Sequence, residues 1–481
     1  MTSPTRRSVD RRIGAIAIPA AIALATEPLF ELCDVAILGH LGTDELGGAS
    51  LAIRLLAFGH AVFIFLMFGT TSAVARRLGA GDRVGAAREA VTAMWIALAI
   101  GLVGTAAFLA SGRVLLTLLG GTGAVADPAW TYLWINAFGL AGFTLTMAGV
   151  GVRRGMLETR TPLVVAAIAA AVNLVADLVL VVGLGFGVGA AALTTTAVKI
   201  GSAVFYVTLV AGEARRQRVS LLPRRLAASA QLRVGRDLVI RTLLLRGAIM
   251  AAQSMAAHRG PTQLAAFAIT FQIWMFCAYA ADGLEAAGQS LVAHERGAAA
   301  VRDAPPHRSS SASSASSASG ASGATAEATA VADHASLPLR LLVARLNAWG
   351  LRLGVVLTLL LLTTSAVLPR LFTTDADVAA AAMHGLWWVG AFSVINTLAF
   401  VGDGILVGAG RQQYLAAAMG AAAIAFAVVA WAGRSNADLA IVWAAISAMM
   451  ATRCVAAFVG VRRFVMATQR DDRHRVGSPA N

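Results

Sequence analysis

The sequence predicts an all-α integral membrane protein with twelve transmembrane helices in two pseudo-symmetric six-helix bundles. Three observations lead to this fold class. The 481 residues are 58% hydrophobic and only 13% charged, about half the charged fraction of a soluble domain. Apolar runs of about 20 residues, each long enough to cross ~30 Å of hydrocarbon, recur along the whole chain. A weak internal repeat divides these runs into two sets of six.

The first apolar run follows a cluster of arginines that resembles the positive start of a signal peptide. The run is too long and too acidic for a cleaved signal, so we expect it to be retained. The expected spans are 13–38, 51–74, 89–112, 129–152, 162–184, 188–211, 238–258, 267–291, 341–368, 381–408, 412–433 and 438–461. We accordingly expect a tail over 1–12, a bundle over 13–214, a basic loop over 215–237, a second bundle over 238–463 and a tail over 464–481.

The internal repeat sets the relation between the two halves. HLGTDELGGASLA at 40–52 resembles HRGPTQLAAFAIT at 258–270, and Ala75 and Gly79 match Ala293 and Gly297 at the same offset of 218 residues. Farther along, GML at 155–157 resembles GIL at 404–406 with an offset of 249, which indicates an insertion in the second half. A Ser/Ala-rich stretch within 298–337 is that insertion, and its composition predicts a disordered linker. Because six spans return the chain to its starting side, the halves share one orientation, and we expect a cavity between them.

Basic residues predict the orientation of the chain. With both termini in the cytoplasm, few of the 39 Lys and Arg fall in external turns, and the positive-inside rule is obeyed. Arg113, Arg259, Arg370 and Arg434 are the external ones, and Arg54, Lys199, Arg352 and Arg453 fall within spans. Most of the others face anionic lipid on the cytoplasmic side, which explains the net charge of +14 without nucleic acid.

Several function classes are excluded by what the sequence lacks. No phosphate-binding glycine loop, His-rich metal motif or nucleophile elbow is present, so we expect neither an enzyme nor an ATP-driven pump, and no cofactor. Cys33, Cys277 and Cys454 all fall within spans, where packing is a better expectation than disulfide bonding.

Acidic side chains interrupt the first span. Glu27, Glu31 and Asp34 lie within about 60° of one another on a helix, although each costs about 2.5–3.5 kcal/mol near the bilayer centre. Pro28 lies beside this stripe and allows a bend. The carboxylates either take part in transport or form hydrogen bonds within the bundle.

Other spans also carry polar groups. Asn173 and Asp177, four residues apart on one helix face, offer hard oxygen ligands that suit Na⁺, and the carboxylate alone suits a proton. Lys199 lies midway along span six, where its ammonium either reaches a carboxylate on span one or five or extends to the interface. On span eight, a cluster of Asp282, Glu285 and Gln289 either faces the cleft and attracts a cationic substrate or holds the bundles together.

The chain resembles the MATE (multidrug and toxic compound extrusion) family, in its DinF-like branch. The matching stretches are PLFELCDVAILGHLGTDELGGASLA, GVRRGMLETRTPL, NLVADLVLVVGLGFGVGAAALTT, DGLEAAGQSLVAHERGA and GDGILVGAG. The resemblance implies two bundles splayed into a V. It also implies export of organic substrates against an inward flow of Na⁺ or H⁺. Asp34 matches the family's functional aspartate, and Thr195 matches a residue that contributes a hydroxyl beside Asn173 and Asp177.

We therefore expect a monomeric antiporter in a bacterial inner membrane that exports small cationic or amphipathic organic molecules, with H⁺ or Na⁺ as the coupling ion. Lys199 is a departure from the family, which is apolar or weakly polar there, and its charge favours H⁺. Two alternatives stay open: a lipid-linked precursor flippase of the same wider superfamily, and a non-transporting membrane receptor or scaffold.

Overall fold

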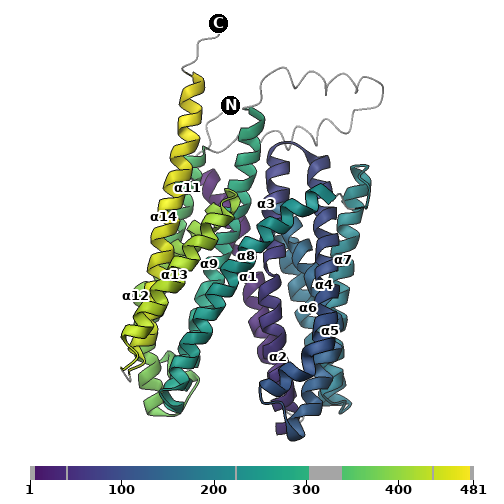
Figure 1. Cartoon of the computed structure of the whole chain (residues 1–481), viewed down its shortest axis with the longest axis vertical. Helices are drawn as coiled ribbons and strands as arrows, with labels where there is room; N and C mark the ends of the chain where they lie inside the picture. Colours follow the sequence, from purple (N-terminus) through teal and green to yellow (C-terminus); the bar gives the residue numbers. More distant parts are fainter. Residues whose placement is uncertain (1–5, 40–41, 223–224, 303–337, 436–437, 477–481) are drawn as a thin grey trace.

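The computed structural model describes residues 6–39, 42–222, 225–302, 338–435 and 438–476, with only the backbone for residues 27–36, 43, 61–62, 225–231 and 469–476. All regular structure in these ranges is helical, which confirms the predicted fold class. The helices form two bundles that lie side by side (Figure 1). The bundles meet at the end where α1 begins and α14 ends, and they diverge toward the opposite end (Figure 1). We call the first of these the closed end.

The first bundle contains the six spans expected from the sequence. The second span consists of two helices, α2 and α3, which join at Ile64. The sixth is preceded by η2, a π-helical turn that directly follows Asp177. The elements are α1 (Arg6–Leu38), α2 (Thr43–Phe63), α3 (Phe65–Gly79), α4 (Arg83–Leu118), η1 (Gly123–Val125), α5 (Ala126–Gly155), α6 (Arg160–Asp177), η2 (Leu178–Gly183) and α7 (Val188–Arg216).

The second bundle repeats this order of six membrane-length helices. Its members are α8 (Arg225–Ala257), α9 (Pro261–Arg302), α11 (Leu339–Thr364), η4 (Leu368–Leu371), α12 (Ala376–Gly408), α13 (Gln412–Ala432) and α14 (Ala440–Val476). Aspartates cap one helix in each bundle. Asp82 Oδ1 accepts a hydrogen bond from Gly85 N at 2.7 Å at the start of α4. Asp375 Oδ1 accepts from Val378 N at 3.1 Å at the start of α12, in the manner usual for N-caps.

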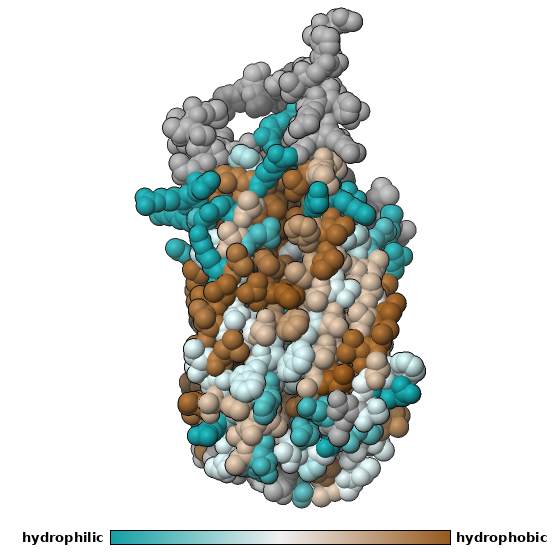
Figure 2. Space-filling model, turned by 90° about the vertical axis from the view of Figure 1, so that its left-hand side faces the viewer, coloured by the Kyte–Doolittle hydropathy of each residue, from teal (hydrophilic) through white to brown (hydrophobic). Residues whose placement is uncertain are grey.

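Length and apolarity make these helices membrane spans. Eleven described segments are long and apolar enough to cross a bilayer, and α1, with 33 residues, provides the twelfth helix. Figure 2 shows apolar and weakly polar side chains over the middle of one face and hydrophilic side chains gathered near the closed end. Such a belt is expected where lipid tails surround the helices.

Several segment boundaries expected from the sequence need correction. Helix α9 runs to Arg302, so the first residues of the expected linker over 298–337 are helical, and the remainder lies outside the described part. The expected basic loop over 215–237 is mostly the ends of α7 and α8, and the tail over 464–481 is largely the end of α14. The helices extend beyond the apolar runs because long basic side chains can place their charge in the membrane interface while their apolar stems lie along the lipid.

The bundles contact each other through glycines at the closed end. A Cβ on Gly79 of α3 would lie 1.8 Å from the backbone oxygen of His294 of α9. Reciprocally, a Cβ on Gly297 would lie 1.9 Å from the backbone oxygen of Arg76. Both pairs are related by the 218-residue offset of the repeat, so repeat-related positions contact each other across the pseudo-symmetry axis. Small residues permit this approach of backbones, which is how helices associate in lipid.

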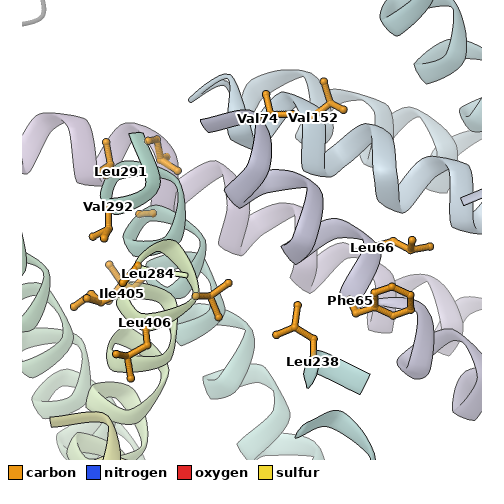
Figure 3. Close-up of a cluster of buried hydrophobic side chains, with 14 of the residues drawn as sticks. Phe65, Leu66, Val74, Val152, Leu238, Leu284, Leu291, Val292, Ile405 and Leu406 are labelled. Atoms are coloured by element: carbon orange, nitrogen blue, oxygen red, sulfur yellow. The ribbon is translucent and has the colours of Figure 1, made fainter. Parts of the chain in front are cut away.

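Buried apolar side chains of both bundles extend this contact. One cluster includes Phe65 and Val74 from α3, Leu238 from α8, Leu291 from α9 and Ile405 from α12. Figure 3 shows these side chains spread along the helices of the contact, with Leu291 and Ile405 on one side and Phe65 and Leu238 on the other. Gln289 of α9 also donates to the Phe68 backbone oxygen and, at 3.0 Å, to Ser72 Oγ of α3. The closed end is therefore joined by both packing and hydrogen bonds.

Gly79→Val is expected to separate the bundles at the closed end, because the new side chain would overlap the backbone of α9. Overlap of this kind typically costs about 1–3 kcal/mol. Labelling of a cysteine introduced near the closed end should therefore become faster, and the thermal stability in detergent should fall. Gly201→Ala is the control, because nothing lies within 4 Å of the Cβ it would introduce. Unchanged labelling and stability in Gly79→Val would contradict the tight contact.

Candidate functional site

A cavity of about 480 Å³ lies between the two bundles. Helices α1, α2, α3, α5, α6 and α7 line it from one side, and α8, α9, α12 and α14 line it from the other. Its apolar wall includes Trp274, Met275 and Tyr279. Phe276, their neighbour, is 39% exposed and is not part of the wall. The volume falls within the range of about 300–1,000 Å³ that is usual for small-molecule sites.

A buried polar cluster joins α6 and α7 beside this cavity. Asn173 and Asp177 are both 0% exposed. Asn173 Nδ2 donates to Thr195 Oγ1 at 3.2 Å. Thr194 Oγ1 donates a short hydrogen bond to Asp177 Oδ1. Since Thr195 also lines the cavity, the cluster lies one side chain away from it.

The cluster brings together the three described residues that were expected to take part in coupling, and it adds Thr194. The π-helical turn begins directly after Asp177. Such turns loosen the backbone hydrogen-bond ladder and are frequent at functional sites. Asp177 is completely buried and accepts a hydrogen bond from Thr194 of α7. Asp177 is the only acidic group that α6 buries among the described residues.

Lys199 lies on the cavity wall one turn after Thr195. Its Nζ donates to Asn136 Oδ1 of α5 at 3.4 Å. Asn136 is 1% exposed and was not singled out from the sequence. Gly142, on the same helix, permits close approach, since a Cβ there would lie 2.9 Å from the Lys199 backbone. The ammonium is thus held in the interior of the protein, between α5 and α7.

The acidic stripe of α1 lies beyond what the structure describes. Glu27, Glu31 and Asp34 belong to the helix, but their side chains are among those outside the described set. Residues Ala23, Leu24 and Thr26, just before the stripe, line the cavity. The path of the α1 backbone therefore leads from the cavity wall into the stripe.

The second bundle holds a buried ionic cluster at the cavity wall. Asp403 of α12 accepts from Arg241 of α8 at 2.5 Å and from Arg453 Nε of α14 at 2.9 Å. Arg241 also lies 3.5 Å from Glu285 of α9. The Arg453 guanidinium lies 4.5 Å from the centre of the Phe400 ring. All four charged residues are less than 9% exposed, and together they connect four helices of this bundle.

Asp403→Asn is expected to destabilise the second bundle, because two buried guanidinium groups would lose their shared counter-charge. Removing one partner of a buried ion pair typically costs about 3–5 kcal/mol. The result should appear as a lower unfolding temperature in detergent and a lower yield of monodisperse protein. Asp377→Asn, an exposed change on the same helix, is the matched control. Wild-type stability of Asp403→Asn would show that the cluster is not structural.

The span-eight cluster divides between its two expected roles. Asp282 and Glu285 line the cavity, as the substrate reading requires. Gln289 is 1% exposed and bonds to α3, as the bundle-joining reading requires. Because Glu285 is paired with Arg241, this cluster offers less free negative charge than its sequence suggests.

Sequence analysis gave no role in the site to three arginines that line the cavity. Arg154 was expected on the cytoplasmic side, and Arg241 and Arg246 fall within the expected span 238–258 without having been singled out. Arg154 is 3% exposed and Arg241 is 7% exposed. Asp403 was part of a quoted motif without being assigned a role. An acid within an apolar span is itself a signal of function or pairing, and that signal was available.

A latch at the closed end joins α1 to the second bundle. Asp10 Oδ1 accepts from Arg345 Nε at 2.8 Å and from Trp349 Nε1 at 2.9 Å. The hydrogen bond from Arg345 holds the pKa of Asp10 below its ordinary value against the opposing effect of burial. The carboxylate therefore stays ionised at neutral pH, and the latch does not respond to the mild pH changes that a proton gradient produces.

These features define a polytopic helical membrane protein with two six-helix bundles around a central cavity, the architecture of a secondary transporter. The profile of the MatE family matches residues 19–179 and 339–432, more than half of the chain. The chain belongs to this family, whose members are multidrug and toxin efflux transporters rather than enzymes.

Two relatives and one solved structure illustrate the similarity. The chain is 27% identical to Protein DETOXIFICATION 43 of Arabidopsis thaliana, over 96% of this chain and 92% of the relative. It is 27% identical to DNA damage-inducible protein F of Escherichia coli, over 62% and 65% of the two chains. A crystal structure of a MATE protein in the straight conformation superposes with a TM-score of 0.80 at 20% identity, covering 98% of this chain and 100% of that one.

Proposed function

We propose that this protein exports small amphipathic organic molecules by antiport with H⁺ or Na⁺, through alternating access of the cavity to the two sides of the membrane. The observation that carries the proposal is the position of Thr195, which lines the cavity and also accepts a hydrogen bond from Asn173 in the buried cluster that contains Asp177. Cation binding at this cluster and substrate binding in the cavity thus share one side chain.

The coupling follows from the cost of a buried charge. An ionised Asp177 favours a packing of α6 and α7 that keeps Thr194 donating to it. Neutralisation by a proton or by Na⁺ weakens that preference and favours a different packing of the first bundle. A ligand shifts such an equilibrium only by its differential affinity for the two states. The cavity exchanges its substrate as the balance shifts.

The orientation and location belong to the same proposal. The termini lie in the cytoplasm and the closed end faces it, so the described conformation opens outward. A bacterial inner membrane is the expected location, with the protein acting as a monomer. Basic residues at the closed end, such as Arg76, Arg77 and Arg83, support this orientation by the positive-inside rule.

The chemical class of the substrate is supported by the wall of the cavity. Trp274, Met275 and Phe400 provide apolar and polarisable surface. The expectation of a cationic substrate rested on the span-eight acids. Glu285 already pairs with Arg241, so that cluster no longer favours a cation over other amphipathic molecules.

Transport by the purified protein in lipid vesicles tests the proposal. Dye export should follow an imposed pH or Na⁺ gradient and should stop when the gradient is collapsed. A lipid-linked precursor flippase would move lipid rather than dye, and a receptor or scaffold would move neither. Gradient-independent or absent movement of every dye would contradict antiport.

A further inference from the structure

Besides Thr146 Oγ1, and besides Arg453 Nη2, which lies 2.7 Å from Asp403, three buried hydrogen-bond donors on the cavity wall have no acceptor among the described residues. They are Arg154 Nε, Arg241 Nε and the Tyr206 hydroxyl. The side chains are 3%, 7% and 1% exposed respectively, and all three line the cavity. Buried donors are normally satisfied, so an unmatched group at a functional site requires an explanation. A molecule that supplies only acceptors would satisfy these three.

Arg154 differs from the other buried arginines in its charge partners. Arg241 and Arg453 share Asp403, whereas no described carboxylate lies within the 4 Å of an ion pair to Arg154. Asp282 and Glu285 act on Arg154 only through longer-range electrostatics. Among the described side chains, the cavity wall carries the cations Lys199, Arg154, Arg241, Arg246 and Arg453 and the carboxylates Asp282 and Glu285.

Backbone packing brings Tyr206 to the same place as Arg154. A Cβ on Gly149 of α5 would lie 2.3 Å from the Tyr206 ring, so this glycine lets the ring of α7 lie directly on α5. Arg154 follows Gly149 by five residues on α5, toward the closed end. Arg154 and Tyr206 also interact electrostatically. A guanidinium fork and a phenol therefore approach one region of the cavity from adjacent helices.

We propose that Arg154 and Tyr206 bind an anionic group of the exported substrate, such as a carboxylate, near the closed end of the cavity. The inference rests on the proposed function and names its substrate class as amphipathic organic anions. A guanidinium presents paired N–H groups that match a carboxylate or phosphate, and the phenol adds a third donor. The remainder of the substrate lies against Trp274, Met275 and Phe400.

Two dyes that share a xanthene ring system but differ in charge test the inference. Fluorescein is anionic at pH 8 and rhodamine 123 is cationic. Their binding to the purified protein in detergent is measured by fluorescence anisotropy, without any gradient. We expect the wild type to bind fluorescein at least about tenfold more tightly than rhodamine 123, a difference of about 1.4 kcal/mol.

Substitutions of Arg154 and Tyr206 should weaken the binding of the anionic dye, fluorescein, and leave the binding of rhodamine 123 nearly unchanged. Arg154→Gln should weaken fluorescein binding about tenfold, and rhodamine 123 binding should change less than about twofold. Arg154→Lys should fall between the two, because it keeps the charge but loses the fork. Tyr206→Phe should weaken fluorescein binding about threefold, as expected for one lost hydrogen bond. Arg153→Gln is the matched control, because Arg153 pairs with Glu158 and does not line this cavity.

The outcomes separate this inference from the proposed function. Tighter binding of rhodamine 123, no binding of fluorescein, or fluorescein binding that ignores Arg154 would overturn the anion site, even if dye export follows a gradient. Fluorescein binding that depends on Arg154, without gradient-driven export of either dye, would support the anion site and contradict the proposed antiport. Should Arg154→Gln fail to fold, unchanged fluorescein affinity in both Arg154→Lys and Tyr206→Phe would overturn the inference.

Discussion

Asp177→Asn is expected to lower gradient-driven export more than about tenfold, equivalent to over ~1.4 kcal/mol, while the protein stays folded. An asparagine oxygen still accepts the hydrogen bond from Thr194 that Asp177 accepts now. The amide is permanently neutral, however, so it neither releases a proton nor attracts Na⁺. The bundle would keep one packing whatever the gradient. Export from vesicles and thermal stability, measured on the same preparation, separate loss of coupling from loss of fold.

The corresponding change on α1, Asp34→Asn, is expected to be at least as severe, because the resemblance to the family implies that Asp34 is its functional aspartate. Asp377→Asn, on the exposed first turn of α12, should export at the wild-type rate and serves as the control for loss of a carboxylate. If Asp34→Asn and Asp177→Asn both export dye normally under the same gradient, the coupling ion binds elsewhere. A normal rate in Asp34→Asn alone would assign coupling to the cluster of α6 and α7.

The sequence was a good guide to the spans and to their grouping. Each of the twelve expected runs corresponds to one helix or, for 51–74, to the pair α2 and α3. This success has a simple cause, since a helix is the structure that satisfies every backbone group within a single segment in lipid. The repeat was informative for a related reason. Gly79 and Gly297 are related by the repeat because each must let the other bundle approach.

The site was only partly predictable, because charge pairing depends on contacts between distant helices. Arg154 directly follows another arginine near the end of a span, a pattern typical of a cytoplasmic loop. Only the packing of α3, α5 and α7 shows that it is buried. Arg241 and Asp403 are 162 residues apart, and no local pattern relates them. Helix periodicity placed Asn173 and Asp177 on one face correctly, because that relation is local.

Lys199→Met is expected to change which ion drives export. With the ammonium present, a second cation at the cluster of α6 and α7 meets like charge, and two unit charges 4 Å apart repel by about 4 kcal/mol at an effective dielectric of ~20. Lys199 follows Thr195 by one turn and donates to Asn136, so its charge is held near the cluster. A proton avoids part of this repulsion, because a lysine and a carboxylate exchange it as a coupled pair. The wild type should therefore export dye under a pH gradient in sodium-free buffer.

Removing the ammonium should shift the pH dependence of export and raise the response to a sodium gradient. Lys199→Arg keeps a positive charge and should keep the proton preference, which makes it the matched control. His60 of α2 is a nearby titratable group whose effect on the pH profile must be distinguished from that of Lys199. Its ring stacks on Phe143 with ring centres 4.1 Å apart, and it interacts electrostatically with Lys199. His60→Gln should leave the choice of ion unchanged if Lys199 determines it. Export driven by sodium alone in the wild type, or an identical pH profile in Lys199→Met, would show that Lys199 does not select the proton.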